Sequence, residues 1–295
     1  MENWRSYYKN LYRKAEEKEI MENDCDEIED ELKTSKEMQE DTIDKDITFE
    51  ELVEAVYALK TNTAAGSDSI LSNDIVELLR ISNENESWKT VEVLEFIHKI
   101  IQHMWKAEKV PEKLKEIVSK PFLKKPDKDP TKPGNYRPVA LLNVLMKLYE
   151  HIIKERLTSY LDKTNYLSNT QAAYRKRRST VDNILILQEV FYYFRYKTGA
   201  RRLNKNMVPL YLAFMDLSKA FDRVPRDKLF KKLWKAGVRG KIYKVIKDIY
   251  TDNGARIRIG EYETKKIIIE SGVMQGSTLG PTLFNIYIND LLVKT

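Results

Sequence analysis

The sequence has few of the residues that build disulfides and metal sites from sulfur or imidazole. Its 295 residues include one cysteine, Cys25, and three histidines, so neither an intramolecular disulfide nor an all-cysteine zinc site can form. His98 and His103 are five residues apart, a spacing that does not put both on one face of a helix, and no H-E-x-x-H motif occurs. A metal-dependent hydrolase is therefore disfavoured.

Long apolar runs are also missing. No stretch approaches the roughly 18 apolar residues of a membrane-spanning helix, and the first ten residues, MENWRSYYKN, lack the apolar core of a signal peptide. These absences predict a soluble, intracellular protein with no membrane partner. The single cysteine agrees with a reducing compartment, and the sequence does not distinguish nucleus from cytoplasm.

The charge of the chain is unevenly distributed. The formal net charge is +6, with 42% hydrophobic and 33% charged residues. Residues 16–50 carry sixteen acidic side chains and four lysines, a balance of −12, so the rest of the chain carries +18. A positive charge of this size attracts a polyanion such as nucleic acid. The alternative is a set of solvated basic helices.

Hydrophobic periodicity, capping signals and proline positions predict an α+β protein without repeating βαβ units. We expect helices over 1–14, from Thr48, over 91–105, 143–161 and 180–196, from Pro225 to Gly237, over 241–250 and from Pro281; extended chain over 117–141; a strand at 208–215; a hairpin over 255–269; and a flexible or frayed acidic linker over 16–46.

Two of these helices have specific signatures. Thr48 and Glu51 form a capping box, and Ile47 faces Leu52 as a hydrophobic staple. In the helix over 91–105 the apolar face is expected to consist of Val93, Leu94, Ile97, Ile101 and Met104.

The strongest local signal is F-M-D-L-S-K-A-F-D at residues 214–222. The preceding run VPLYLAFM at 208–215 has the length and composition of a strand buried on both faces, and it delivers Asp216 at its polar end. A carboxylate held there is a suitable ligand for Mg²⁺. Taken alone, an aspartate after an apolar run is more often a turn or a helix cap.

The second signal is the loop S-G-V-M-Q-G-S-T-L-G-P at 271–281. Its glycines allow the backbone to approach a flat ligand closely, and the Gln275 amide donates and accepts hydrogen bonds. The simpler interpretation is a loop that opens a helix at Pro281. It is not a P-loop, because no glycine is followed by Lys and then Ser or Thr.

Two basic segments complete the pattern. Lys124 and Lys125, with Arg137 in N-Y-R-P-V, suit a triphosphate, and Arg175 and Arg178 in Q-A-A-Y-R-K-R-R-S-T suit phosphate backbones. The alternatives are solvated surface lysines for the first segment and a nuclear-localisation patch for the second.

These four segments, in this order, resemble the successive sequence blocks of the non-LTR retrotransposon reverse transcriptases. The resemblance rests on NYRPVALLN, QAAYRKRRSTVDN, FMDLSKAFDRVPRDKLFKKL and GVMQGSTLGPTLFNIYINDLL, and it extends to the helix at Thr48 with its A-A-G-S-D loop. Ala173 and Tyr174 depart from the family's usual glycine and phenylalanine.

The resemblance implies a role for each matching residue in RNA-directed DNA synthesis. Asp216 is the first metal-binding aspartate, with the main chain of Leu217 and Ser218 facing the second of two Mg²⁺ ions and the phosphates. Phe221 is the steric gate that selects deoxynucleotides, Gln275 and Gly276 line the nascent base pair, Lys124, Lys125 and Arg137 hold the triphosphate, and Arg175 and Arg178 contact template or nucleotide. The implied partners are an RNA template, a DNA primer and deoxynucleoside triphosphates.

The resemblance also implies a right-hand polymerase fold, with an N-terminal helix and acidic linker over 1–46, fingers over 47–205 and a partial palm over 206–295. In the family a Tyr/Phe-Ala-Asp-Asp hairpin follows the last helix seen here, and Asp290 is not that motif. We therefore expect a chain that lacks the catalytic hairpin and the thumb. By itself it should be inactive as a polymerase and marginally stable or prone to aggregate.

Two other functions stay open. One is a non-catalytic nucleic-acid-binding module, since residues 223–247 carry ten basic side chains and one acidic side chain. The other, an α-helical interaction protein built on the acidic segment, does not account for the four ordered blocks.

Overall fold

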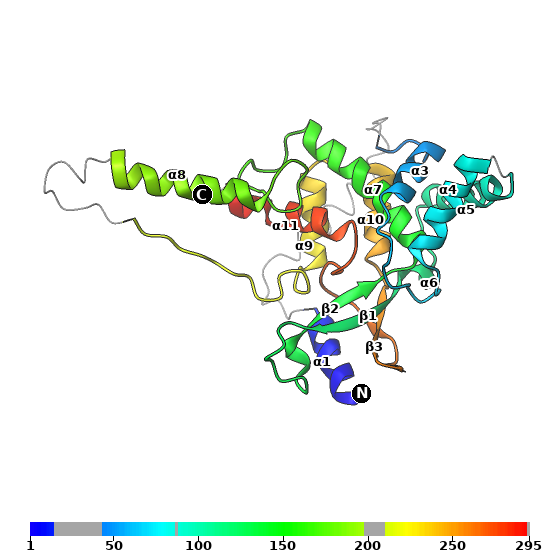
Figure 1. The fold of residues 1–295 in the computed structure, drawn as a ribbon, viewed down its shortest axis with the longest axis horizontal. Coiled ribbons are helices and arrows are strands. Elements are labelled where there is room, and N and C mark those ends of the chain that lie inside the picture. The colour runs from blue at the N-terminus through cyan, green and yellow to red at the C-terminus, as the bar shows by residue number, and fades with distance from the viewer. Residues whose placement is uncertain (15–42, 86–87, 198–209, 294–295) are drawn as a thin grey trace, which may run out of the picture.

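The computed structural model describes residues 1–14, 43–85, 88–197 and 210–293. Helices surround one mixed sheet, so the α+β prediction is confirmed (Figure 1). The elements are α1 (Glu2–Tyr12), α3 (Phe49–Tyr57), α4 (Ser72–Asn85), α5 (Trp88–Ala107), α6 (Glu112–Lys115), β1 (Glu116–Leu123), the 3-10 helix η1 (Pro133–Asn135), β2 (Tyr136–Leu141), α7 (Val144–Lys163), α8 (Thr180–Tyr192), the π-helix η2 (Tyr193–Lys197), α9 (Arg226–Lys235), α10 (Gly240–Ile249), β3 (Gly254–Ile259), β4 (Tyr262–Glu263), β5 (Ile267–Ile268) and α11 (Gly280–Val293).

The sheet joins two distant parts of the chain. β1 is antiparallel to β2, with Pro121 opposite Pro138, and parallel to β3, with Glu116 opposite Gly254. β4 and β5 both pair antiparallel with β3. The expected fingers and partial palm segments thus contribute strands to one sheet, and a domain boundary between them stays a prediction.

The core lies where helices pack on this sheet and on one another. α10 shows how its sequence produces the packing: Ile242, Val245, Ile246 and Ile249, spaced three or four residues apart, are all fully or almost fully buried. That spacing places them on one face of the helix. α7 contacts α3, α5 and α6 and buries residues on several sides.

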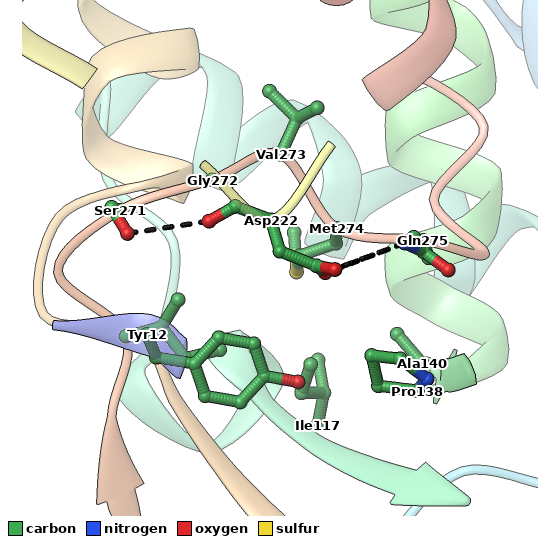
Figure 2. Close-up of a pocket in the computed structure, with 11 residues that line it drawn as sticks. Tyr12, Ile117, Pro138, Ala140, Asp222, Ser271, Gly272, Val273, Met274 and Gln275 are labelled. Atoms are coloured by element: carbon green, nitrogen blue, oxygen red, sulfur yellow. Dashed lines mark hydrogen bonds between the residues drawn. The ribbon is translucent and has the colours of Figure 1, made fainter. Parts of the chain in front are cut away.

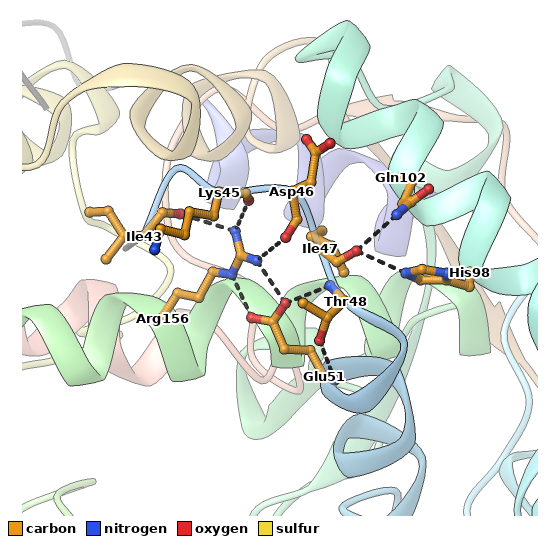
Figure 3. Close-up of polar contacts among 9 residues, drawn as sticks. All are labelled: Ile43, Lys45, Asp46, Ile47, Thr48, Glu51, His98, Gln102 and Arg156. Carbon is orange, nitrogen blue, oxygen red and sulfur yellow. Dashed lines mark hydrogen bonds and ion pairs between the residues drawn. The ribbon is translucent and has the colours of Figure 1, made fainter. Parts of the chain in front are cut away.

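Arg156 of α7 fixes the segment that leads into α3. Its guanidinium donates to both carboxylate oxygens of Glu51, at 2.6 and 2.7 Å, and to the carbonyl oxygens of Ile43, Lys45 and Asp46 (Figure 3). The planar donor fork of arginine suits such a set of acceptors. Residues 43–46 of the expected acidic linker are therefore held against the core, and residues 16–42 lie outside the described part.

The start of α3 confirms the predicted capping box. The Thr48 hydroxyl accepts from the Glu51 amide at 3.3 Å, and the Glu51 carboxylate accepts from the Thr48 amide at 2.9 Å. The preceding carbonyl, that of Ile47, accepts from His98 Nε2 and from Gln102 Nε2 of α5 (Figure 3). His98 is therefore a structural residue.

The first helix is attached to both the hairpin and a distant loop. Trp4 of α1 packs edge-on against Tyr136 of β2, with ring centroids 4.8 Å apart. The carbonyl oxygen of Tyr12 at the other end accepts from the amides of Glu270 and Ser271, at 2.9 and 3.1 Å. α1 is thus part of the folded body.

Most of the expected elements are confirmed within a few residues, but two expectations about burial are wrong, those for Val93 and for the run at 208–215. Helix α4 was not expected at all. Val93, expected on the apolar face of its helix, is 41% exposed, whereas Leu94, Ile101 and Met104 are buried. Consecutive residues of a helix point about 100° apart, so Val93 lies at the edge of the face that Leu94 and Ile101 bury.

The run at 208–215 is not a buried strand, contrary to the prediction. Its described residues, 210–215, pair with none of the described strands, and Tyr211, Phe214 and Met215 are 86%, 84% and 85% exposed. Figure 1 shows the segment extended and away from the sheet. A strand is stabilised by neighbours that pair with its backbone and cover its side chains, and no described segment does so here.

α8 is exposed in a similar way. It projects from the body in Figure 1, and none of its residues is buried. Its exposed apolar side chains include Val181, Ile184, Leu185 and Ile186. Within the described ranges, no helix has both the length and the apolar character needed to span a bilayer.

Candidate active site

The site is built around the loop between β5 and α11, residues 271–280, which lies against the turn at 217–224. The amide of Gly272 donates to the carbonyl of Val224 at 2.8 Å, and the amide of Val273 donates to the carbonyl of Phe221 at 2.9 Å. Gly272 has φ +90°, and a Cβ atom there would lie 2.7 Å from the carbonyl oxygen of Asp222. Glycine is therefore needed for this close backbone approach.

A second close approach joins the same loop to β2. The amide of Ala140 donates to the carbonyl of Gln275 at 2.6 Å. The next residue, Gly276, has φ +111°, and a Cβ atom there would lie 2.5 Å from the carbonyl oxygen of Ala140. These contacts bring two predicted site residues, Gln275 and Gly276, beside the strand that carries Arg137.

Arg226, at the start of α9, holds the 271–280 loop through its guanidinium group. Its Nε donates to the carbonyl of Gly272 at 3.1 Å, and its Nη1 donates to Asn253 Oδ1 at 2.9 Å and to the carbonyls of Tyr250 and Ile269. Burial lowers the pKa of the Arg226 guanidinium to about 10, so the group is still charged at neutral pH. A buried cation with this many acceptors fixes the backbone that it contacts.

Glu150 of α7 supports the other end of the loop. Its carboxylate accepts from Ser277 Oγ at 2.7 Å and from the amide of Thr278 at 3.0 Å. The Ser277 hydroxyl oxygen accepts in turn from the amides of Leu279 and Gly280, where α11 begins. Glu150 is 0% exposed, and burial raises the pKa of its carboxyl group to about 7.

Asp222, in the 217–224 turn, faces the 271–280 loop (Figure 2). Its carboxylate accepts from Gln275 Nε2, at 3.4 Å to Oδ1 and 3.3 Å to Oδ2. Burial raises the pKa of the Asp222 carboxyl group to about 6, and the positive charges of Lys219 and Lys124 oppose that increase. The adjoining cavity, which Tyr12 also lines, has a volume of about 10 Å³, room for about one water molecule.

Phe221 is held by two aromatic rings. It stacks on Phe284 of α11, with centroids 4.6 Å apart and planes at 17°, and it meets Tyr174 edge-on at 5.9 Å. The loop that carries Tyr174 is itself tied to α11, because Asn285 Nδ2 donates to the carbonyl of Ala173 at 2.9 Å. The structure thus brings together the predicted Phe221, the loop containing Gln275, and the basic segment at 171–180.

The predicted basic residues differ in their surroundings. Lys125, Arg137 and Arg178 are exposed, and so is Lys124, whose Nζ donates to the carbonyl of Gly134 at 3.0 Å. By contrast, the Arg175 side chain is only 18% exposed. It turns inward and donates to the carbonyls of Ser168 and Gln171, at 2.8 and 3.4 Å.

Asp216 is separate from this assembly. It is exposed, as are Leu217 and Ser218. The described residues contain no group of three or more His, Cys, Asp or Glu side chains placed to hold a metal ion. The carboxylate therefore stands without the further acidic ligands that a two-ion site requires.

The predictions from sequence omitted three of the residues that shape the site: Asp222, Glu150 and Arg226. Asp222 adjoins the predicted Phe221 in the A-F-D sequence, so its position next to the site could have been noticed. Glu150 gave only a weak signal, an acidic residue among the apolar ones of a central helix. Arg226 looked like one more basic residue on a basic helix.

Comparisons with known proteins identify the family of the chain. Residues 123–295, more than half of the chain, match the family model "Reverse transcriptase (RNA-dependent DNA polymerase)". This range contains the β1–β2 hairpin loop, the 171–180 segment, the 217–224 turn and the 271–280 loop.

Individual relatives are distant and much longer. The chain is 26% identical over 254 residues to the probable RNA-directed DNA polymerase from transposon BS of Drosophila melanogaster. The aligned region covers 84% of this chain and 25% of that protein. It is 27% identical over 249 residues to the RNA-directed DNA polymerase from the mobile element jockey of the same organism, covering 84% and 25%. A match to the transposon TX1 uncharacterized 149 kDa protein of Xenopus laevis, 26% identical, covers 98% of this chain and 20% of that protein.

The chain thus spans about a quarter of the length of the first two relatives. Because the family model matches most of it, and its distant homologues are polymerases of non-LTR retrotransposons, the chain belongs to the reverse transcriptase family.

Proposed function

We propose that this chain forms part of an RNA-directed DNA polymerase that adds deoxynucleotides to a DNA primer on an RNA template. The observation that carries the proposal is the position of Phe221 and Gln275. In a member of the reverse transcriptase family, the turn that carries the Phe221 ring is hydrogen-bonded to the loop that carries the Gln275 amide, from the Val273 amide to the Phe221 carbonyl and from Gln275 to the Asp222 carboxylate.

The chemistry of each side chain suits one part of a nucleotide. Phe221, fixed between Phe284 and Tyr174, is the proposed steric gate, since a rigid ring excludes a ribose 2′-hydroxyl by its volume. Gln275 and Gly276 line the nascent base pair. The exposed cations Lys124, Lys125 and Arg137 bind the triphosphate by charge and by the bidentate geometry of arginine.

Template contact is proposed for the 171–180 segment. Arg178 is exposed and is free to approach a phosphate backbone. Arg175 is occupied by the carbonyls of Ser168 and Gln171, so its contribution to template binding is to hold the loop in shape. This refines the role that resemblance alone implies for it.

The described residues do not fit a pair of Mg²⁺ ions. Asp216 supplies one exposed carboxylate, and the main chain at Leu217 and Ser218 adds only neutral carbonyl oxygens, whereas two hard cations need several shared carboxylate ligands. We therefore assign metal-dependent nucleotidyl transfer to a longer polymerase. In that protein a downstream carboxylate hairpin pairs with 210–217 and covers the apolar side chains of this segment.

Primer extension tests the proposal. The transcript should first be read beyond codon 295, and the protein that contains the chain with its downstream polymerase segment should extend a DNA primer on an RNA template with deoxynucleotides. Asp216→Asn should abolish extension, whereas Asp252→Asn, at an exposed turn aspartate, should not. The 295-residue chain itself should not extend a primer. Extension by the long protein that survives Asp216→Asn would refute the proposed role of Asp216.

A second function has its own support, namely nucleic-acid binding without catalysis. Because the described residues contain no group of three or more His, Cys, Asp or Glu side chains that could hold a metal ion and residues 223–247 are strongly basic, the chain alone is expected to bind RNA through phosphate contacts. Such binding weakens steeply with salt, with a slope of roughly −0.7 per phosphate contact for single strands. Fluorescence anisotropy at several salt concentrations measures this slope, and binding that salt does not weaken would exclude the electrostatic mode.

A further inference from the structure

We propose that Asp222 is a positioning residue that fixes the orientation of the Gln275 amide and thereby sets nucleotide selectivity at the proposed site. The inference rests on the proposed function as far as the nucleotide is concerned. The contact itself is a property of the chain as described.

The chemistry of the contact fixes its direction. An ionised carboxylate only accepts hydrogen bonds, whereas a glutamine amide has a donor end and an acceptor end. Asp222 therefore pairs with Gln275 Nε2, because the opposite orientation would place acceptor oxygens against each other. The amide oxygen of Gln275 consequently points away from Asp222 (Figure 2). A neutral side chain with both donor and acceptor atoms would not impose this choice.

Asp222 is also held in place by its surroundings. Its side chain is buried, and its carbonyl oxygen accepts from Ser271 Oγ at 3.3 Å (Figure 2). Gly272 approaches so closely that a Cβ atom there would lie 2.7 Å from that same carbonyl oxygen. The backbone of Asp222 is thus clamped against the loop whose side chain it orients.

The charges around Asp222 favour its ionised form. The titratable and charged groups that interact with the Asp222 carboxylate are the cations Lys219 and Lys124 and the buried tyrosines Tyr8 and Tyr12. The lysines favour the ionised carboxylate, and burial disfavours it. With its pKa raised only to about 6, the group is ionised at the neutral to mildly alkaline pH at which the contact should be tested.

Asp222 also lies where it can connect the two proposed nucleotide-contacting residues. Asp222 follows Phe221, the proposed steric gate, and it contacts Gln275, which lines the proposed base pair. Among the described residues, it is the group that links these two by both backbone and side chain. An error in its placement would shift the amide and leave the ring where Phe284 and Tyr174 hold it. Asp222 is therefore expected to act on selectivity through Gln275.

The structural test uses the 295-residue chain and the side-chain amide signals of Gln275 in a ¹⁵N–¹H spectrum at pH 8, assigned with Gln275→Glu. Asp222→Leu keeps the branching of the side chain and removes the acceptors, whereas Asp222→Asn keeps one acceptor oxygen. We expect the Gln275 signals to move to free-amide positions in Asp222→Leu and to return partway in Asp222→Asn. Glu261→Ala, at an exposed carboxylate, is the matched control and should not move them.

The rest of the spectrum shows whether each variant is folded. If Asp222→Leu unfolds the chain, Asp222→Ala, which also lacks an acceptor, replaces it in the comparison. Gln275 signals that stay in place in a folded variant without the acceptor overturn the inference, whatever the polymerase does.

The functional test uses the longer polymerase and compares kcat/KM for correctly paired deoxynucleotides with that for mispaired ones. We expect roughly a tenfold loss of selectivity in Asp222→Leu, about the effect of losing one charge-assisted hydrogen bond, and partial recovery in Asp222→Asn. The double variant with Gln275→Ala should be no worse than Gln275→Ala alone, because Asp222 acts through that side chain. Additive losses overturn the positioning role. A wild-type protein that incorporates no nucleotide while the amide contact holds refutes the proposed function and leaves the contact supported.

Discussion

Two segments that carry the proposed chemistry differ sharply in how they are held. The loop at 271–280 is bonded to β2, to the 217–224 turn and to side chains of α7 and α9. The segment at 210–217, which leads to Asp216, has exposed side chains and no described strand beside it. The loop is therefore fixed by hydrogen bonds in this chain, whereas none of the described strands pairs with the segment that leads to Asp216.

The comparison teaches that an apolar run does not fold a strand by itself. Both segments have strong sequence signals, but the loop finds buried partners within residues 123–295 and the apolar run does not. Since burial and pairing stabilise a strand far more than its intrinsic preference does, composition alone predicted the wrong state for 210–215.

The largest effect is expected from Arg226→Met. The substitution leaves the carbonyl oxygens of Gly272, Tyr250 and Ile269 without their donor in a buried place. Each unsatisfied buried group costs about 1–3 kcal/mol, so the free energy of unfolding should fall by about 4 kcal/mol in urea denaturation. Arg223→Met, at an exposed arginine three residues earlier, should change it by less than about 0.5 kcal/mol. Equal losses would mean that Arg226 does not support the loop.

A somewhat smaller effect is expected from pH through Glu150. Its carboxyl pKa rises from 4.5 to about 7 on folding. Between these values the native state holds more protons than the unfolded state, so stability is full below pH 4.5 and decreases as pH rises through 7. The free energy of unfolding should fall by about 3 kcal/mol as the pH rises from below 4.5 to above 7.

Unfolding at several pH values measures this dependence. Glu150→Gln should remove most of it and leave the part due to Asp222, whose carboxyl pKa is raised to about 6 and which acts in the same direction. A pH dependence that Glu150→Gln does not alter would show that this carboxyl group does not titrate in the folded chain as described.

Gly276→Ala tests the close approach between the loop and β2. A Cβ atom would lie 2.5 Å from the carbonyl oxygen of Ala140, at φ +111°. This combines a clash with backbone strain, so the free energy of unfolding should fall by about 2–3 kcal/mol. At Gly260, φ is +59° and a Cβ atom meets nothing within 4 Å, so Gly260→Ala should cost only about 1 kcal/mol. Thermal unfolding of both variants gives the difference, and equal costs would place the loop farther from β2.

The smallest effect is expected in the unsupported segment. Phe214→Ser should change the free energy of unfolding of the 295-residue chain by less than about 0.5 kcal/mol, because the ring is 84% exposed. Removing the ring should also reduce self-association, measured by light scattering, since it reduces exposed apolar surface. A buried strand would instead lose about 3–5 kcal/mol for such a truncation. Such a loss would show that residues 210–215 form the buried strand expected from the sequence, and the two segments would then not differ in burial.

Much of the fold was predictable because its signals are local. The capping box of Thr48 and Glu51, the apolar stripe of α10 and the hairpin around Gly260 each depend on residues a few positions apart. The resemblance likewise identified Phe221, Gln275 and Gly276, which the structure brings to one place. The domain boundaries and the roles of the site residues stay predictions.

The remaining features depend on residues that are far apart in the chain. Glu150 meets Ser277 across 127 positions and Asp222 meets Gln275 across 53, and no spacing rule connects such pairs. Arg175 was expected to face nucleic acid, and its inward position follows from carbonyl oxygens that only the folded loop presents.

By itself, the sequence determined the helices with capping signals, the hairpin, the basic character of the chain outside 16–50 and its membership of the reverse transcriptase family. Only the tertiary structure decided that the run at 210–215 is exposed and unpaired, and that buried carboxylates hold the 271–280 loop. The physical reason is that periodicity and capping act over one or two turns, whereas burial and pairing depend on which distant segments are present to cover a surface.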